Sequence, residues 1–280
     1  MSYDKITIVI NTFKSEDKIH RCLNSIDPSV KIIIVENSNN LNSKNEIEKK
    51  YSNVDCLLSG LNLGYAKGNN LGLSKVKSDY ALILNPDAFL EKETLNRLLL
   101  TAEKYKDFSV IGPAKQDEFS TFDKNKDKED VFKASYLKGF AMFFNLKQFK
   151  EIGFFDENFF IYLEEIDLCK RLMKQNKKIY LDKKVVVNHL GGSSHNEKIN
   201  FEMELSRNWH WMWSTFYYNK KHFGYFFSLL KFSGRLFSSF IKFLFYALIL
   251  NNNKRKIYFQ RFSGLLNSIL GRDSWYRPKF

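Results

Sequence analysis

An apolar run that stops at a polar turn constrains the fold of this chain more than any other stretch. Residues 80–84, Tyr-Ala-Leu-Ile-Leu, predict a buried strand, and Asn85-Pro86-Asp87 follows directly. Proline has a fixed φ and no N–H to donate, so the strand has to end at Pro86. Asn85 and Asp87 therefore emerge together at its carboxyl end, where open α/β sheets bind ligands. A simple turn has the same composition, so the rest of the chain has to decide between the two interpretations.

Strand and helix patterns alternate along the first three quarters of the chain. Strands are expected at residues 6–11, 31–36, 54–58, 133–137, 140–144 and 185–189, and helices at 15–25, 65–75, 94–105 and 163–174. This alternation predicts βαβ units, hence an α/β fold with a mostly parallel central sheet flanked by helices. Residues 116–130 are charged and poor in apolar side chains, which predicts a mobile loop. Without a repeat or linker, residues 1–205 are expected to form one domain.

The positive charge is concentrated at the end of the chain. The net charge is +13, and residues 207–280 hold 13 Lys and Arg but one acid, Asp273. The first 206 residues carry 31 basic and 30 acidic side chains, so the tail and not the body is expected to have an electrostatic partner. Three widely separated cysteines and an N-terminus that leads straight into a strand predict a reduced, intracellular protein without a signal peptide.

The tail, residues 206–280, predicts a helical extension that binds an anionic membrane surface. An aromatic belt is expected from Trp209, Trp211, Trp213, Phe216, Tyr217 and Tyr218. Residues 225–250 are long and apolar enough to span a bilayer, but Lys231, Arg235 and Lys242 interrupt them. Such charges favour an amphipathic helix in the membrane plane over a span. The alternative is a tail that packs on the body or forms a homodimer.

Polar residues at other strand ends predict a ligand site. Thr12 and Glu36-Asn37 follow two predicted strands, and a glycine-rich turn opens the helix at residues 62–70. Backbone N–H groups in such a turn can approach a phosphate, and an acid at a strand end can bind ribose hydroxyls. The spacing matches neither a Walker loop nor a GxGxxG fingerprint. A capped helix start with flexible glycines is the alternative.

Two further groups predict catalytic chemistry. Glu164, Glu165 and Asp167 follow an aromatic stretch, and a carboxylate near apolar groups has a raised proton affinity that suits a general base. Acids in a first helical turn also serve the helix dipole, which is the structural alternative. His189 ends another strand and, next to Asp87, would complete the coordination of a divalent metal. A lone histidine with an ordinary hydrogen bond is the alternative there.

Seven segments in this order resemble the family 2 glycosyltransferases, in particular their rhamnosyltransferase-like branch. They are Ile8-Val9-Ile10-Asn11-Thr12-Phe13, Val35-Glu36-Asn37-Ser38, Asn62-Leu63-Gly64-Tyr65-Ala66-Lys67-Gly68-Asn69-Asn70, Leu84-Asn85-Pro86-Asp87, Gly153-Phe154-Phe155-Asp156-Glu157-Asn158-Phe159-Phe160, Tyr162-Leu163-Glu164-Glu165-Ile166-Asp167-Leu168-Cys169-Lys170-Arg171 and His189. The resemblance covers about residues 5 to 222 and implies a GT-A fold, a Rossmann-like domain that binds a nucleotide-sugar.

The resemblance also implies roles for individual residues. Asp87, in the place of the last residue of an Asp-x-Asp motif, would hold Mg²⁺ or Mn²⁺ together with His189. Glu165 would be the catalytic base, with Glu164 as the neighbouring candidate. The nucleotide-sugar site would comprise Thr12, Glu36, Asn37, Asn62, Gly64, Lys67, Gly68, Asn70, Asn85 and Gly139. Glu36 and Glu165 are each one methylene longer than the aspartate usual in the family.

The implied reaction is an inverting transfer from a dTDP- or UDP-sugar, for example dTDP-rhamnose, to a lipid-linked glycan acceptor. Such a protein is expected in the cytoplasm, bound peripherally to the membrane during surface polysaccharide synthesis. A non-catalytic membrane- or nucleic-acid-binding protein with a basic aromatic tail is a second interpretation, although the near-neutral body and the apolar residues 240–250 speak against nucleic acid. A nucleotidyltransferase is a third, but residues 11–15 lack its basic glycine-rich signature.

Overall fold

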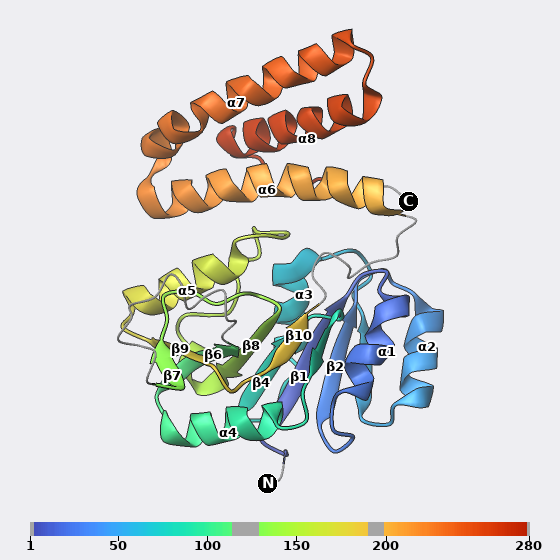
Figure 1. The fold of residues 1–280 in the computed structure, drawn as a ribbon, viewed down its shortest axis with the longest axis vertical. Helices are drawn as coiled ribbons and strands as arrows, with labels where there is room; N and C mark the ends of the chain where they lie inside the picture. The colour runs from blue at the N-terminus through green and yellow to red at the C-terminus, as the bar shows by residue number, and fades with distance from the viewer. Residues whose placement is uncertain (1–2, 114–128, 190–198, 279–280) are drawn as a thin grey trace. The chain divides into compact units, whose positions relative to one another are not determined.

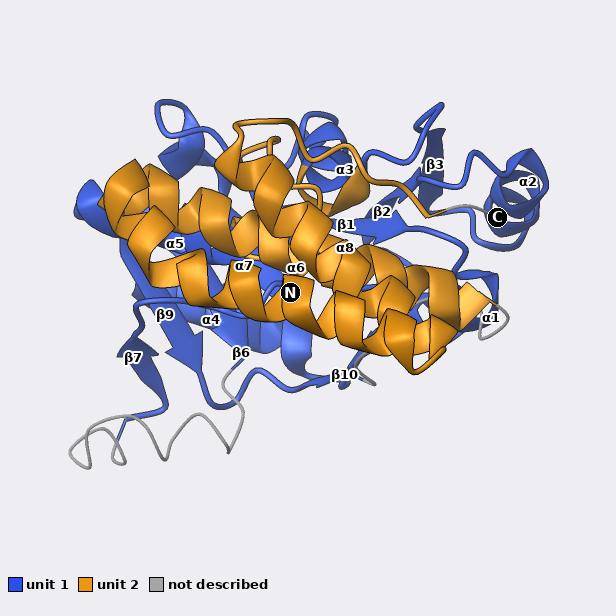
Figure 2. Ribbon diagram, turned by 90° about the horizontal axis from the view of Figure 1, so that it is seen from above, with its two compact units in different colours: residues 1–63, 67–155, 165–196 blue, residues 64–66, 156–164, 197–280 orange. Residues whose placement is uncertain are grey.

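The structure is a computed structural model that describes residues 3–113, 129–189 and 199–278. The chain forms two compact units, coloured separately in Figure 2. The first comprises residues 1–63, 67–155 and 165–196, and the second residues 64–66, 156–164 and 197–280. The second unit thus takes two short segments from within the predicted first domain, and the expected boundary between residues 205 and 206 falls inside helix α6 (Asn200–Phe223).

An eight-stranded mixed sheet forms the centre of the first unit (Figure 1), with the strand order β3-β2-β1-β4-β8-β6-β9-β7. The strands are β1 (Ile6–Thr12), β2 (Lys31–Glu36), β3 (Val54–Leu58), β4 (Tyr80–Leu84), β6 (Phe108–Pro113), β7 (Val131–Lys133), β8 (Ala141–Asn145) and β9 (Lys178–Asp182). The strands from β3 to β4 are parallel, β6 and β9 are parallel, and β8 runs antiparallel to both β4 and β6. The predicted α/β class with a mostly parallel sheet is confirmed.

The β1 and β2 strands are buried because their side chains are apolar on both faces. Ile8, Val9 and Ile10 in β1 and Ile34 in β2 are fully buried. Strands covered on both faces need such continuous apolar runs, and helices supply the cover. These helices are α1 (Glu16–Asn24), α2 (Leu41–Lys50), α3 (Gly64–Leu73), α4 (Thr94–Lys104) and α5 (Glu164–Lys174).

Some elements differ from the sequence-based expectation. Helix α2 was not expected because Ile47 is its one buried residue; the Asn40 side chain caps it by accepting from the Ser43 N–H, and a Lys44–Glu48 ion pair supports it. Strands β6 and β9 were also missed. The strand expected at residues 133–137 lies instead at Val131–Lys133. The predicted loop at 116–130 lies almost wholly outside the described residues.

A two-stranded ribbon at the end of β4 positions the predicted metal ligands. Strand β5 (Ala88–Leu90) pairs antiparallel with β10 (Val187–His189), and His189 stands opposite Ala88. The turn that begins at Pro86 therefore leads into β5, next to the strand that ends at His189. This pairing joins two segments that are about a hundred residues apart in the sequence.

The second unit contains three long helices, α6, α7 (Tyr225–Leu248) and α8 (Asn252–Ile269). Trp209, Trp213 and Phe216 are buried in it, so the prediction of an aromatic belt for membrane contact is wrong for these three residues. They pack inside the helical unit, where Trp209 Nε1 donates to Ser263 Oγ and Trp213 Nε1 donates to the Arg272 carbonyl oxygen. Among the described residues, no helix is long and apolar enough to cross a membrane.

Residues 156–164 fold with these helices. Phe159 and Phe160 are buried, and the Phe160 ring stacks on His210 with 4.4 Å between centroids. Ser214 Oγ donates to the Ile161 carbonyl oxygen at 2.9 Å. Burial lowers the pKa of His210 to about 3, so this imidazole is neutral at physiological pH. The aromatic stretch before the predicted base thus belongs to the core of the tail.

Candidate active site

The predicted metal ligands lie together. His189 Nε2 is 3.2 Å from Asp87 Oδ1, and the Asp87 side chain is only 2% exposed. Asp87 Oδ1 has no hydrogen-bond partner within the described part of the chain, which is costly for a buried oxygen. A carboxylate and an imidazole are a donor pair that suits Mn²⁺, and an unsatisfied buried oxygen suits a hard cation. The two side chains therefore fit a divalent metal, although the described residues contain no cluster of three such donors.

Phe140 and Asn85 build the surroundings of this pair. The Phe140 ring stacks on His189 with centroids 4.6 Å apart and an interplanar angle of 6°. The Asn85 N–H donates to the Phe140 carbonyl oxygen at 2.9 Å, which joins the end of β4 to the start of β8. The described hydrogen bonds of Asn85 involve its backbone, so its half-buried side chain remains available to a ligand. No pattern in the sequence predicted the role of Phe140.

A cavity of about 190 Å³ lies beside Asp87. Its lining comes from helix α1 and from the turn into β5, namely Asp17, Lys18, Arg21, Cys22, Pro86, Asp87, Ala88 and Phe89. The Arg21 guanidinium lies 3.8 Å from the centroid of the Phe89 ring. Lys18 and Arg21 place two cations near a carboxylate, a mixed lining that suits a metal-bound anion. Neither residue was predicted as part of the site.

The polar residues at the ends of strands β1 and β2 lie where they were expected, but Glu36 and Thr12 form hydrogen bonds with the neighbouring backbone. Both oxygens of the buried Glu36 accept backbone hydrogen bonds, from Ser38 at 2.9 Å and from Asn40 at 2.6 Å. Thr12 Oγ1 donates to the Val35 carbonyl oxygen at 3.3 Å. Glu36 therefore stabilises the turn after β2. A nucleoside hydroxyl would have to donate to a carboxylate oxygen that already accepts a backbone hydrogen bond.

Asn37 links this turn to the start of α3. Its Nδ2 donates to Asn11 Oδ1, and its Oδ1 accepts from the Leu63 N–H at 3.3 Å. Gly68 lies against the Asn11 side chain, where any Cβ would overlap the amide. The predicted residues of β1, β2 and α3 thus meet in one network at the carboxyl edge of the sheet.

The other predicted binding residues differ in accessibility. Lys67 is exposed and Asn62 half-buried, so both side chains reach the surface. Asn70 instead makes a paired contact with the backbone of Phe155, donating to its carbonyl oxygen at 2.9 Å and accepting from its N–H at 3.1 Å. Gly139, half-buried, immediately precedes Phe140. Asn70 therefore positions the segment before α5.

Gly64 is required for packing. Its φ is +76°, and a Cβ would overlap the backbone carbonyl oxygen of Phe160, which also accepts from the Tyr65 N–H. We expect Gly64→Ala to lower the free energy of unfolding by at least about 2 kcal/mol, because a left-handed φ and a backbone overlap both oppose the methyl group. Urea denaturation measures the change.

Gly60 is the matched control for this prediction. Its φ is also +76°, but nothing lies within 4 Å of a Cβ built there. Gly60→Ala should therefore cost only the conformational strain, about 1 kcal/mol. Equal losses in the two variants would show that the approach of Phe160 to Gly64 contributes nothing.

The three candidate acids on α5 have different surroundings. Glu165 is half-buried, and desolvation raises its pKa while the backbone N–H groups of Glu165 and Ile166 act in the opposite direction. Glu164 is buried. Asp167 Oδ2 accepts from Arg171 Nε at 2.8 Å, and Arg171 also donates to the carbonyl oxygens of residues 152 and 154. Asp167 thus anchors a loop, whereas the raised pKa of Glu165 is a property that suits a general base.

An unusual backbone turn precedes these acids. Tyr162 and Leu163 have φ values of +76° and +68°, a left-handed conformation that is costly for residues other than glycine. The Tyr162 ring meets Trp211 edge-on with centroids 5.5 Å apart, and burial raises the pKa of Tyr162 to about 12. Local backbone strain of this kind is concentrated at functional sites.

A chain of contacts connects α5 to the Asp87 region. The Cys169 thiol is hydrogen-bonded to the Leu137 backbone, and its burial raises its pKa to about 12. Leu137 lies three residues before Phe140, which stacks on His189. Helix α5 and the Asp87–His189 pair are therefore held by the same loop before β8.

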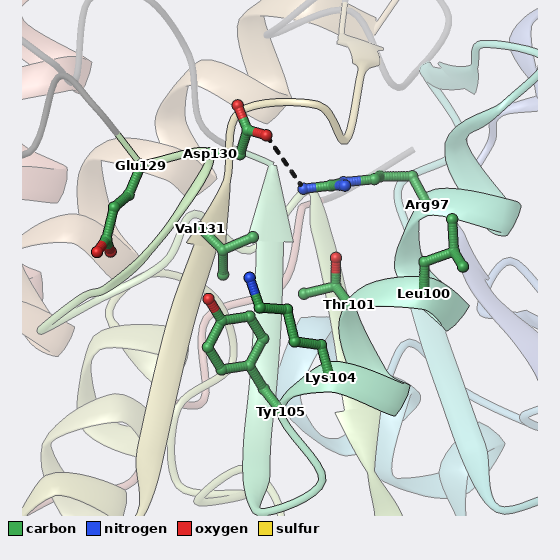
Figure 3. A pocket seen from close by; sticks show the side chains of 8 residues that line it. All are labelled: Arg97, Leu100, Thr101, Lys104, Tyr105, Glu129, Asp130 and Val131. Carbon is green, nitrogen blue, oxygen red and sulfur yellow. Dashed lines mark ion pairs between the residues drawn. The ribbon is translucent and has the colours of Figure 1, made fainter.

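Another cavity, of about 320 Å³, lies between α4 and the start of β7 (Figure 3). The ion pair drawn there joins Arg97 to Asp130 at 4.0 Å. Arg97 also donates to both oxygens of Asp182, and Thr101 donates to Asp182 as well. This network holds α4 against β9, and none of the predicted site residues lines the cavity. We assign it a structural role.

Known proteins resemble this chain in sequence and in fold. The model of glycosyl transferase family 2 matches residues 7–169. Low-salt glycan biosynthesis hexosyltransferase Agl10 of Haloferax volcanii is 26% identical over 198 residues, which are 62% of this chain but only 63% of Agl10. Rhamnosyltransferase WbbL of Escherichia coli is 28% identical over 249 residues, 76% of this chain and 92% of WbbL. The N-acetylglucosaminyl-diphospho-decaprenol L-rhamnosyltransferase of Mycobacterium tuberculosis is 20% identical over 239 residues, 68% of this chain and 78% of that enzyme.

Among solved structures, mannosyltransferase PcManGT from Pyrobaculum calidifontis, in complex with GDP-Man and Mn²⁺, shares the fold. The two structures superpose with a TM-score of 0.62 at 10% identity, covering 96% of this chain and 88% of PcManGT. The GT-A fold with its C-terminal helical extension is thus confirmed. Two of these relatives are rhamnosyltransferases. Since the family model covers more than half of the sequence, the chain belongs to glycosyl transferase family 2.

Proposed function

We propose that the protein transfers a sugar from a nucleotide-diphosphate donor to a hydroxyl of a lipid-linked glycan acceptor, with inversion at the anomeric carbon. The observation that carries the proposal is the buried Asp87 Oδ1, which lies 3.2 Å from His189 Nε2 at the carboxyl end of β4. A buried oxygen without a hydrogen-bond partner in the described residues is stabilised when a cation binds it.

Asp87 and His189 would hold a divalent cation, Mg²⁺ or Mn²⁺, and such a cation offsets the charge that develops on a diphosphate leaving group. The Phe140 ring orients His189 by stacking on it, and the strand pairing of β5 with β10 fixes both ligands. Asn85, with its side chain at the same strand end, is placed to hydrogen-bond the donor. Thr12 and Asn37 lie at the neighbouring strand ends and Lys67 in the first turn of α3, where the nucleotide would lie.

Glu165 is the proposed base. Desolvation raises its pKa, so its carboxylate takes a proton more readily than an exposed glutamate does. It would remove the proton from the acceptor hydroxyl, whose oxygen attacks the anomeric carbon while the bond to the diphosphate breaks. A single displacement needs no enzyme nucleophile, and the three cysteines are buried.

The relatives support a lipid-linked acceptor and a deoxyhexose donor. The name of the mycobacterial relative specifies an acceptor sugar joined to decaprenol through a diphosphate and the transfer of L-rhamnose. WbbL is also a rhamnosyltransferase. We therefore place dTDP-rhamnose and UDP-sugars first among the donors, and surface polysaccharide synthesis as the process.

A donor screen tests this proposal. We expect one class among dTDP-, UDP- and GDP-sugars to raise the melting temperature of the protein, and to do so more strongly when Mn²⁺ is present, because binding to the native state stabilises it. Transfer is then followed by nucleotide release with a lipid-linked and a soluble acceptor. The absence of any nucleotide-sugar binding, with or without Mn²⁺, would overturn the proposed function.

A further inference from the structure

Helix α7 packs within its own unit along one face. Ser228, Phe232 and Ser239 are its buried residues, and Phe232 forms a small core with Met212 and Leu265. Figure 1 shows α7 running alongside α8, and half-buried Phe243 and Tyr246 contact rings of that helix. The opposite side of α7 is exposed and mostly apolar.

The exposed apolar side chains of α7 lie along one side of the helix and form a stripe, with Ser233 and Gly234 between Leu230 and Phe237. Leu230 is 80%, Phe237 67% and Leu248 82% exposed. The further members are Phe226, Phe227, Phe240, Ile241, Leu244 and Phe245. At 3.6 residues per turn they occupy an arc of roughly 140°. Scattered exposed leucines are ordinary in soluble proteins, but a contiguous patch of this size marks an interaction site.

Basic side chains lie along one flank of this stripe. Lys231, Arg235 and Lys242 are all exposed and fall between the apolar arc and the packing face of the helix. Lys231 Nζ is 5.8 Å from the centroid of the Phe227 ring, and the Arg235 guanidinium is 5.2 Å from that of Phe232. Long basic side chains of this kind can keep their charge at a polar surface while their stems cover apolar neighbours.

We propose that α7 lies in the plane of an anionic membrane, with the stripe inserted among the lipids and the basic flank at the headgroups. An apolar face beside a cationic one is the form of an interfacial helix. Residues 207–280 hold 13 basic side chains and one acid, so the electrostatic partner of this segment is expected to be negative. The inference stands apart from the sugar chemistry, although a lipid-linked acceptor would be presented at this surface.

The charge distribution selects the lipid surface over a second copy of the chain. Pairing two identical stripes would bring Lys231, Arg235 and Lys242 of both copies to the same interface without acids between them. Like charges at an interface oppose association. Anionic headgroups instead neutralise the flank, and the apolar stripe needs no shape-matched partner in a fluid bilayer.

Vesicle co-sedimentation of the full-length protein tests the proposal. The wild type should bind phosphatidylcholine vesicles that contain phosphatidylglycerol, weakly bind vesicles without it, and dissociate as salt increases. The variant Leu230→Gln/Phe237→Gln/Leu248→Gln removes three exposed apolar side chains from the stripe. We expect it to lower the affinity for anionic vesicles at least about tenfold, because less apolar surface enters the bilayer.

The matched control is Leu41→Gln/Leu100→Gln/Val186→Gln, in which three exposed apolar residues outside α7 change in the same way. It should bind vesicles as the wild type does. Unchanged binding by the stripe variant would overturn the proposal. A second result would also overturn it: the wild type does not bind anionic vesicles but forms a dimer, and the stripe variant is monomeric. That result would assign the stripe to contact with a second copy of the chain. Binding of the nucleotide-sugar, measured in parallel, tests the proposed function separately, because its result does not depend on vesicle binding.

Discussion

Glu165→Gln should lower kcat about 10²- to 10⁴-fold, the usual contribution of a general base, while the dissociation constant of the nucleotide-sugar stays close to that of the wild type. Glutamine has nearly the same shape as glutamate but cannot take the proton of the acceptor hydroxyl. Isothermal titration with the donor and an initial-rate assay of transfer separate the two quantities.

The pH profile supplies a second measure of the same role. A base is active when ionised, and desolvation raises the pKa of Glu165, so the acid limb of kcat in the wild type should lie above the ordinary glutamate pKa of about 4.3. Activity should be lost as the pH falls through that raised value. The residual activity of Glu165→Gln should lack this limb. A limb that persists unchanged would assign the base role to another group.

Two substitutions distinguish Glu165 from acids nearby. Asp167→Asn breaks the ion pair with Arg171 and should lower the melting temperature while the acid limb of kcat stays in place, because that pair anchors residues 152 and 154. Glu151→Gln changes an exposed acid outside α5 and should alter neither the melting temperature nor the acid limb of kcat. If Asp167→Asn removed the limb and Glu165→Gln did not, the base assignment would have to move to Asp167.

Asp87→Asn should weaken Mn²⁺ binding and lower transfer about 10²- to 10³-fold at a fixed metal concentration, because one anionic ligand and its contribution to leaving-group stabilisation are lost. Asparagine retains the size of the side chain, so the melting temperature of the metal-free protein should change little. Titration of Mn²⁺ followed by electron paramagnetic resonance reports metal binding without reference to activity.

The control for this variant is Asp55→Asn, which removes the same charge from an exposed position on β3. Its Mn²⁺ affinity and activity should match those of the wild type, which excludes a general effect of net charge. Mn²⁺ affinity that is equal in Asp87→Asn and the wild type would remove Asp87 from the metal site.

The sequence predicted the parts of the fold that depend on local apolar patterning. The isoleucine and valine runs of β1 and β2 favour strands because both residues are β-branched, and polar residues at their ends mark the ligand-binding edge. The polar helix α2 offers no such pattern, since a capping side chain and an ion pair hold it in place. Strands β6 and β9 could be recognised only from their pairing with neighbouring strands in the sheet.

Within the candidate site, the positions of Asp87 and His189 followed from strand ends and from resemblance to a family. The hydrogen-bond partners of Glu36, Asn70 and Asp167 could not be predicted from the sequence. Each side chain is paired with backbone groups or with an arginine that folding brings near it. Phe140 was missed for the same reason. A side chain's chemistry can be read from the sequence, but the identity of its partner cannot.

The membership of residues 156–164 in the helical unit has a consequence for engineering. Phe160 stacks on His210, and Asp156 accepts hydrogen bonds from Tyr217 and Lys221, so the loop leading to Glu164 is shaped by helix α6. The C-terminal helices therefore cannot be exchanged between family members as an independent module. A functional chimaera would have to carry residues 64–66 and 156–164 from the same parent as its tail, or the graft would disturb the segment that leads to Glu165, the proposed base.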